Sequence, residues 1–169
     1  MARPEFFMSV RNEVEFLQKW WYIKNKGQKE AIRMVISTKG RYALRIMLDL
    51  AQHSEDGFVS LKTVSQRQEV SLKYMEAIAA VLNRAGLVVS QRGKEGGYRL
   101  SRPAAEISGA EVLHSAEGSL AAVSCLESGE SCCERAEHCL TLPMWKKLDA
   151  LMDGYLSGIS IQDVLDGNV

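Results

Sequence analysis

The stretch that decides the fold runs from residue 71 to residue 100 and reads SLKYMEAIAAVLNRAGLVVSQRGKEGGYRL. Ser71 is a favourable helix N-cap, and the apolar residues after it recur at helical spacing until Gly86, which is placed to end the helix. Residues 87–90 and 98–100 then predict two short strands joined by a glycine-rich turn. The sequence here predicts a helix followed by a β-hairpin.

Two more helices are predicted upstream of this stretch. From Lys39 onward, apolar residues repeat on one helical face, namely Ala43, Ile46, Met47, Leu50 and Ala51. Ser60 is expected to cap a short helix that reaches Gln66, and Glu69 and Val70 to form a turn. Helix, short helix, turn, helix and hairpin is the order of a winged helix-turn-helix. We therefore expect a mainly α-helical fold with a small β-wing.

A long C-terminal helix is predicted downstream. Thr141 and Pro143 are typical of a helix start. Apolar residues follow at steps of three and four, namely Trp145, Leu148, Met152, Tyr155 and Ile159. So narrow a seam is typical of a helix that packs against a partner subunit, although packing on its own domain fits the spacing nearly as well. Ser160 is expected to cap a last short helix.

We expect four parts along the chain. They are an N-terminal extension (1–33), a winged helix-turn-helix DNA-binding domain (34–118), a cysteine-rich loop (119–141), and a dimerisation helix with the C-terminal tail (142–169). The codons of residues 29–31 can contain a bacterial ribosome-binding site at a normal distance from Met34. Met34 is therefore expected to be the physiological start, and a genuine helical N-terminal arm is the alternative.

Composition and charge exclude several classes of protein. An apolar share of 46% and a charged share of 25% are ordinary for a globular chain, and no apolar run is long enough for a membrane span. No secretory signal is present, so we expect a cytoplasmic protein with reduced thiols. No acid, base and pocket can be assembled, so neither an enzyme nor a small-molecule substrate is expected. Residues 34–102 hold eleven lysines and arginines against six acidic residues, whereas residues 103–169 hold three against eleven, which favours a polyanionic partner for the middle of the chain.

The helix after Ser71 has the composition of a DNA-reading helix. Its core-facing residues are expected to be Met75, Ile78, Ala79 and Leu82, and its outer face carries Lys73, Glu76, Ala77, Ala80 and Arg84. Small residues between charged ones permit close approach to a major groove, although an ordinary solvated face has the same residue types. The hairpin favours DNA, because its three glycines allow a tight tip from which Arg92 and Lys94 project towards a minor groove.

All four cysteines lie close together, in the stretch SCLESGESCCERAEHCL. Their spacing is C-x6-C-C-x5-C, which lacks the paired knuckles of structural zinc sites. Clustered thiols in a reducing compartment favour a metal site over disulfides, and an iron–sulfur cluster and a set of free thiols fit the spacing about equally well. The surrounding glutamates disfavour a thiolate with a lowered pKa.

Together these motifs resemble a known family. STKGRYALRIMLDLA, SLKYMEAIAAVLNRAGLV, RGKEGGYRL and the cysteine loop are similar to the winged-helix iron–sulfur transcriptional regulators typified by IscR, NsrR and RirA, over about residues 34–166. The cysteine spacing looks most like the RirA branch. The resemblance implies a homodimeric bacterial regulator that binds a double-stranded DNA operator and whose DNA affinity depends on a 2Fe-2S or 4Fe-4S cluster, sensing iron, iron–sulfur status, oxygen or nitric oxide.

The resemblance also assigns residues. It places the cluster on Cys125, Cys133 and Cys139. Leu142 stands where the IscR branch has a histidine ligand, so Cys132 or His138, a partner's carboxylate or an added thiol would complete the set. The expected DNA contacts are Arg41, Ser71, Lys73, Tyr74, Glu76, Arg92, Lys94 and Tyr98. The alternative function is a cluster-free or zinc- and thiol-based regulator of the CymR type, serving cysteine metabolism or redox sensing.

Overall fold

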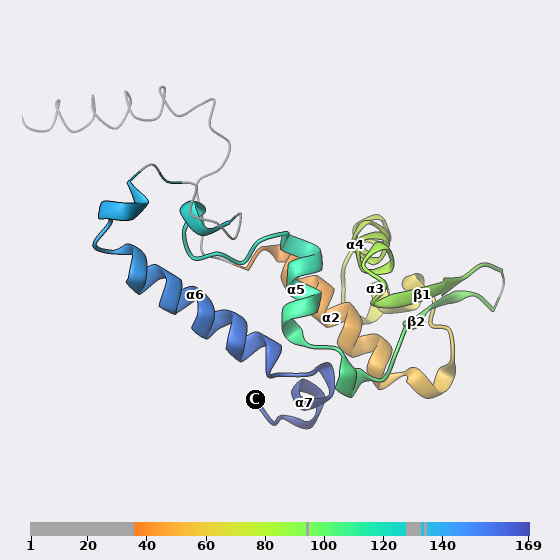
Figure 1. Cartoon of the computed structure of the whole chain (residues 1–169). Helices are drawn as coiled ribbons and strands as arrows, with labels where there is room; N and C mark the ends of the chain where they lie inside the picture. The colour runs from red at the N-terminus through yellow and green to blue at the C-terminus, as the bar shows by residue number, and fades with distance from the viewer. Residues whose placement is uncertain (1–35, 94, 128–132, 134) are drawn as a thin grey trace, which may run out of the picture. The chain divides into compact units, whose positions relative to one another are not determined.

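The computed structural model describes residues 36–93, 95–127, 133 and 135–169. The chain divides into two units, residues 1–33 and 34–169. The predictions for residues 1–33, for Lys94 and for Cys132 therefore lie outside the described residues. Figure 1 shows the order of elements in the second unit.

Six α-helices and one two-stranded sheet make up the described part of the second unit. They are α2 (Thr38–Gln52), α3 (Leu61–Arg67), α4 (Leu72–Arg84), β1 (Val88–Gln91), β2 (Gly97–Leu100), α5 (Gly109–Glu117), α6 (Leu142–Ser157) and α7 (Ile161–Asp166). Four single 3-10 turns join them: η1 (Ser54–Asp56), η2 (Ala104–Glu106), η3 (Ser124–Leu126) and η4 (Ala136–His138). This mainly helical architecture with a small wing is the expected fold class.

Serine side chains start the helices at the predicted places. The Ser60 hydroxyl accepts a hydrogen bond from the Thr63 amide, and the Ser71 hydroxyl accepts one from the Tyr74 amide. Ser160 caps α7 in the same way. These three predicted caps are confirmed, because each hydroxyl satisfies an amide that has no acceptor within its own helix.

The wing is attached to the domain through close backbone contacts. Strands β1 and β2 are antiparallel, with Val88 opposite Leu100. Beside them, the Val59 and Tyr98 backbones exchange two hydrogen bonds, of 2.9 and 2.8 Å. A Cβ atom on Gly97 would lie 2.3 Å from the Val59 carbonyl oxygen, so only glycine allows this approach.

Helix α2 runs through the core, with α4, α5, α7 and the sheet packed around it. Ala43, Ile46 and Met47 of α2 are fully buried. Asp49, also buried, accepts hydrogen bonds from Arg67 and Gln68, which lie where α3 meets the turn before α4. Burial acts to raise the pKa of Asp49, but these hydrogen bonds outweigh burial and hold that pKa below its usual value. The helix-turn-helix is thus fixed to the core by a buried carboxylate.

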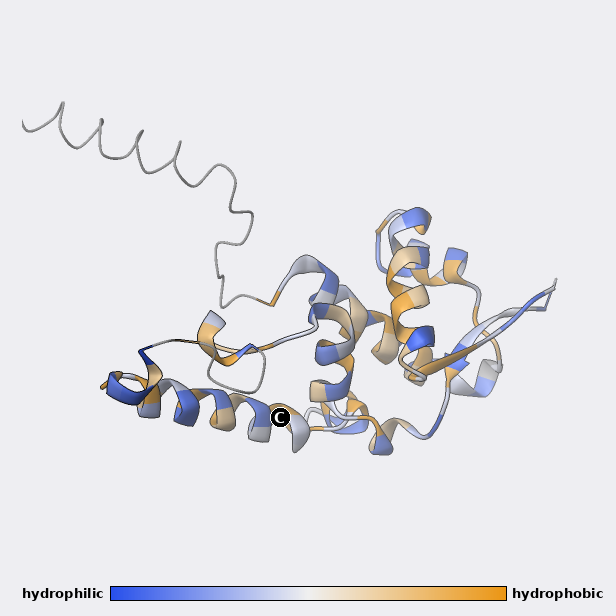
Figure 2. Cartoon of the chain, turned by 45° about the horizontal axis from the view of Figure 1, so that its top comes forward, coloured by the Kyte–Doolittle hydropathy of each residue, from blue (hydrophilic) through white to orange (hydrophobic). Residues whose placement is uncertain are grey.

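Helix α6 packs against α5 with only part of its apolar surface. Hydrophobic and hydrophilic residues alternate along it (Figure 2), and Leu142 is its one buried residue. Of the predicted seam, Trp145, Leu148, Met152 and Ile159 are half-buried, whereas Tyr155 is 61% exposed. The seam is therefore not one uniform face. No helix in the described part of the chain is long and apolar enough to cross a bilayer.

Candidate nucleic-acid interface and cysteine segment

Helix α4 presents the predicted two faces. Met75, Ile78, Ala79 and Leu82 are at most 1% exposed, as predicted. On the opposite side Lys73, Glu76, Ala77 and Arg84 are exposed, and Ala80 is half-buried. The outer face of α4 therefore combines small residues with charged ends, which suits contact with base edges in a major groove.

Tyr74 lies at the start of α4 but faces inward. Its ring packs edge-on against the ring of Tyr42 in α2, with the ring centres 5.9 Å apart. Tyr74 is half-buried against the core, so its ring links α2 to α4. The predicted DNA contact from Tyr74 stays a prediction, and the described packing gives this residue a structural role as well.

Two arginines of α2 lie on the exposed side of the domain. Arg41, which was expected to contact DNA, donates a hydrogen bond to the Thr38 hydroxyl. The Arg45 guanidinium lies 5.0 Å from the centre of the Tyr42 ring, and its Nε donates to the Gln68 side chain at 2.7 Å. Arg45 was not among the predicted DNA contacts, although it lies one helical turn after Arg41 on the same exposed side of α2.

The wing presents two described arginines. Arg92, directly after β1, is exposed as its predicted role requires. Arg99 of β2 is also exposed, and its guanidinium lies 5.1 Å from the centre of the Phe58 ring. Tyr98 instead packs against the core and is half-buried, because successive strand residues point to opposite faces. Alternation along β2 therefore favours Arg99 over Tyr98 as an outward-facing group.

The cysteine segment, residues 118–141, connects α5 to α6. Its described cysteines are free thiols: Cys125 in η3 and Cys139 after η4 are half-buried, and Cys133 is exposed. His138, the alternative fourth ligand, is exposed in η4. Within the described ranges, no group of three or more His, Cys, Asp or Glu side chains is gathered as a metal site.

Cys139 has an environment that the sequence did not reveal. Hydrogen bonding with the Thr141 hydroxyl, 3.4 Å from Sγ, and with backbone groups of Thr141 and Leu142 lowers the pKa of the Cys139 thiol. The prediction that the surrounding glutamates disfavour a lowered pKa is wrong for this thiol, because its hydrogen bonds at the start of α6 lower that pKa. Thr141 stands at the predicted N-cap position of α6 and Pro143 in its first turn, although the Thr141 side chain makes no capping hydrogen bond.

These thiols suit an iron–sulfur cluster by their chemistry. Thiolate is the ligand form that such clusters take, and the lowered pKa of Cys139 favours that form. All three described cysteines lie outside the hydrophobic core, and all three are free thiols. The donor set therefore fits the group that the resemblance implies.

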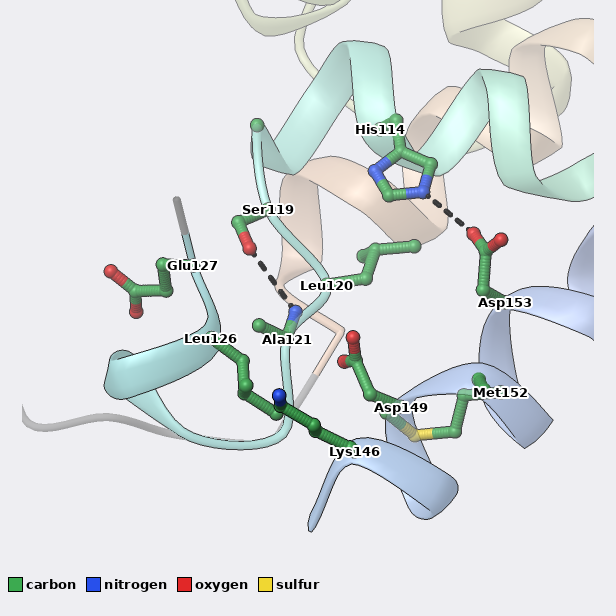
Figure 3. A pocket seen from close by; sticks show the side chains of 12 residues that line it. His114, Ser119, Leu120, Ala121, Leu126, Glu127, Lys146, Asp149, Met152 and Asp153 are labelled. Atoms are coloured by element: carbon green, nitrogen blue, oxygen red, sulfur yellow. Dashed lines mark hydrogen bonds and ion pairs between the residues drawn. The ribbon is translucent and has the colours of Figure 1, made fainter. Parts of the chain in front are cut away.

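A cavity of about 550 Å³ separates the first part of the cysteine segment from α6 (Figure 3). Leu120, Ala121, Leu126 and Glu127 line one side, and Lys146, Asp149, Met152 and Asp153 of α6 line the other. Across it, the His114 ring nitrogen lies 3.1 Å from the Asp153 carboxylate, and the Ala122 amide donates to Asp149 at 3.3 Å. The segment that carries Cys125 is thus bonded to α6, and α6 in turn is bonded to α5.

Comparison with known proteins gives the family. The profile of the Rrf2 family, described as "Iron-dependent Transcriptional regulator", matches residues 36–167. The chain belongs to the Rrf2 family. The match covers the helix-turn-helix, the wing, the cysteine segment and α6.

Relatives within the Rrf2 family narrow the class of regulator. The HTH-type transcriptional regulator IscR of Photorhabdus laumondii is 41% identical over 133 residues, which are 79% of this chain and 80% of that protein. The solved structure of T. potens IscR has a TM-score of 0.63 and 34% identity, over 83% of this chain and 92% of that one. CymR, the global cysteine regulator of B. subtilis, has a TM-score of 0.63 and 33% identity, over 76% and 93%.

These comparisons establish a bacterial helix-turn-helix transcriptional regulator rather than an enzyme. DNA binding follows from membership in this class of regulator. Both an IscR and a CymR are among the structural neighbours, so fold similarity alone does not separate the two functions that the sequence left open.

Proposed function

We propose that this Rrf2 regulator is a homodimer whose affinity for an operator depends on an iron–sulfur cluster held by Cys125, Cys133 and Cys139. The observation that carries the proposal is the set of three free thiols on one segment between α5 and α6, one of them with a lowered pKa. The organisation of the chain supports it, since this segment joins the DNA-binding domain to the helix with unburied apolar surface.

The DNA-binding half performs its task with the described side chains. The outer face of α4 enters the major groove, where Lys73 reaches phosphate or base edges and Glu76 accepts from an exposed amino group such as that of cytosine. The amides at the start of α4, beside Ser71, favour a phosphate. Arg92 on the wing reaches the neighbouring minor groove.

The cysteine half holds its thiols next to two helix ends. Cys125 lies in η3, eight residues after the end of α5, and Cys139 lies three residues before α6 begins. When bound, an iron–sulfur cluster supplies thiolate-ligated iron whose presence depends on iron supply and oxidants. Cys125 and Cys139 then restrain the two ends of the segment, and Cys133 restrains its middle.

The exposed apolar side chains of α6 are the basis for the proposed homodimer. Met144, Leu151 and Tyr155 are 54%, 61% and 61% exposed, and their spacing places them on one side of the helix. Leu140, just before the helix, is 96% exposed. We propose that this stripe, Leu140, Met144, Leu151 and Tyr155, packs against the same stripe of a second copy, which buries apolar surface that the single chain leaves in water.

A thiol-based regulator of the CymR type is the second candidate. It is favoured by the exposure of Cys133, by the lowered pKa of Cys139 and by the structural similarity to CymR. In that case the thiols themselves respond to oxidants, and no iron is required.

The experiment is anaerobic purification of the full chain, followed by its visible spectrum and its iron and sulfide content. A coloured protein with stoichiometric iron and sulfide is expected. Cys133→Ala should lose colour, iron and sulfide, whereas Cys132→Ala should keep them unless Cys132 is the fourth ligand. A colourless wild-type chain after anaerobic reconstitution would contradict cluster binding and support the thiol-based candidate.

A further inference from the structure

Glu117, the last residue of α5, makes contacts that neither DNA binding nor metal binding explains. Its Oε1 accepts hydrogen bonds from the Ser37 amide at 3.0 Å, the Ser37 hydroxyl at 2.7 Å and the Gly40 amide at 3.0 Å. The preceding Ala116 carbonyl accepts one from the Lys39 ammonium. The end of α5 therefore holds the first turn of α2, which lies 77 to 80 residues earlier in the chain.

The contact satisfies groups that a helix cannot satisfy by itself. The first amides of α2 have no acceptor within the helix, and a negative charge is favoured at a helix N-terminus. Gly40 makes room for the carboxylate, because a Cβ atom there would lie 2.2 Å from the Glu117 Oε1. Glycine inside a helix lowers its stability relative to alanine. The space that Glu117 needs accounts for glycine at this position.

Glu117 lies between the two functional halves. On one side α2 carries Arg41 and, through Tyr42, contacts Tyr74 at the start of α4. On the other side Gly118, at φ 86°, ends α5, and the chain continues directly into the stretch that holds Cys125. A displacement of that stretch therefore acts first on the residue that fixes the start of α2.

We infer that Glu117 is a positioning residue that couples the stretch around Cys125 to the first turn of α2, and through α2 to the DNA-binding surface. The inference rests on the proposed function for its biological signal, but the coupling is a property of the chain without a cluster. Coupling between two sites is reciprocal. DNA bound at α2, α4 and the wing must then change the reactivity of Cys125.

The test uses the full chain without iron, and a duplex of about 30 base pairs that the protein has selected from a random pool, long enough for two half-sites. The rate of Cys125 alkylation by iodoacetamide is measured by site-resolved mass spectrometry, with and without saturating duplex at low salt. The variants are Glu117→Ala, which removes the carboxylate, and Gly40→Ala, whose added methyl group displaces the carboxylate. Alanine has a higher helix propensity than glycine, so the second variant keeps α2 folded. Glu111→Ala is the matched control, because Glu111 is on the same helix but bonds to Ser108 and Arg102 instead.

In the wild type and in E111A, the duplex should slow alkylation of Cys125 by about fivefold or more, the lower end of typical coupling between sites. In E117A and G40A, the slowing should fall below about twofold. Retention of the wild-type slowing in both E117A and G40A, or no slowing in the wild type, would overturn the inference. Since the assay needs no iron, its failure is separate from an absence of iron and sulfide, which would count against the proposed function.

Discussion

Helices α4 and α6 are both amphipathic, yet the single chain buries the apolar face of α4 only. The apolar face of α4 is covered within its own chain, where Met75 and Leu82 are fully buried. Helix α6 buries only Leu142 and leaves Leu151 and Tyr155 61% exposed. The polar face of α4 therefore stays exposed in the single chain, and the uncovered apolar face of α6 is the surface that we propose to pack against a second copy. A leucine-to-alanine substitution in each helix should distinguish the two: in α4 it should lower the unfolding free energy, and in α6 it should weaken dimerisation.

The largest effect is expected from Leu82→Ala in α4. The side chain is fully buried, so its truncation leaves a cavity and should cost about 2–5 kcal/mol of unfolding free energy. Urea unfolding followed by circular dichroism measures it. A loss below about 1 kcal/mol would mean that α4 is not covered as described.

A second large effect is expected from Asp49→Asn, which weakens the contact between α2 and the turn before α4. Hydrogen bonds to a charged group contribute about 1.5–3 kcal/mol, so unfolding near neutral pH should become easier by about that amount. The pKa of Asp49 is lowered in the folded chain, so its stabilisation is present above its ordinary pKa near 3.8 and is lost as pH falls below that value.

The pH dependence provides the control for Asp49. The wild type should lose stability on acidification below about pH 4, and D49N should lose less, because asparagine does not titrate. Urea unfolding at each pH measures the loss of unfolding free energy. Equal losses in the wild type and D49N would show that Asp49 is not a source of the acid sensitivity.

The same truncation in α6, Leu151→Ala, should behave differently from L82A. Because Leu151 is 61% exposed, the unfolding free energy of dilute protein should change by less than about 0.5 kcal/mol. Dimerisation should weaken instead, as measured by light scattering over a dilution series. An unchanged dimer affinity would remove Leu151 from the interface that we propose.

The smallest effect is expected on the DNA side, from Arg92→Ala. Loss of one cationic contact should reduce the slope of log affinity against log salt by about one. Lys146→Ala in α6 is the matched control and should leave the slope unchanged. If the slope of R92A equals that of the wild type, the wing arginine does not contact phosphate.

The contrast between α4 and α6 also explains how far the sequence could be interpreted. Periodicity and serine caps predicted both faces of α4, because both depend on residues within a few positions of one another. The same periodicity did not predict which residues of the α6 seam are buried, since spacing shows which residues share a face and not which neighbour covers them. Trp145 is half-buried and Tyr155 is exposed, although both belong to the predicted seam.

Features of the site that depend on distant residues were not predictable from the sequence. The contact of Glu117 with Ser37 joins residues 80 positions apart, and no local pattern marks it. The lowered pKa of Cys139 depends on its hydrogen bonds with Thr141, the N-cap residue of α6, and the predicted helix start did not imply those bonds. Cys125, Cys133 and Cys139 could be chosen from spacing and resemblance, and their role as ligands stays a prediction.

The measurement that tests the central claim most directly is operator affinity of the full chain, purified without oxygen, before and after iron is removed with a chelator. Fluorescence anisotropy with the selected duplex should show a change of about fivefold or more, as expected for coupling between two sites. The operator affinity of Cys133→Ala, before and after chelator treatment, should equal that of the iron-free wild type. Equal affinities of the wild type before and after iron removal would contradict a regulator whose DNA binding depends on an iron–sulfur cluster.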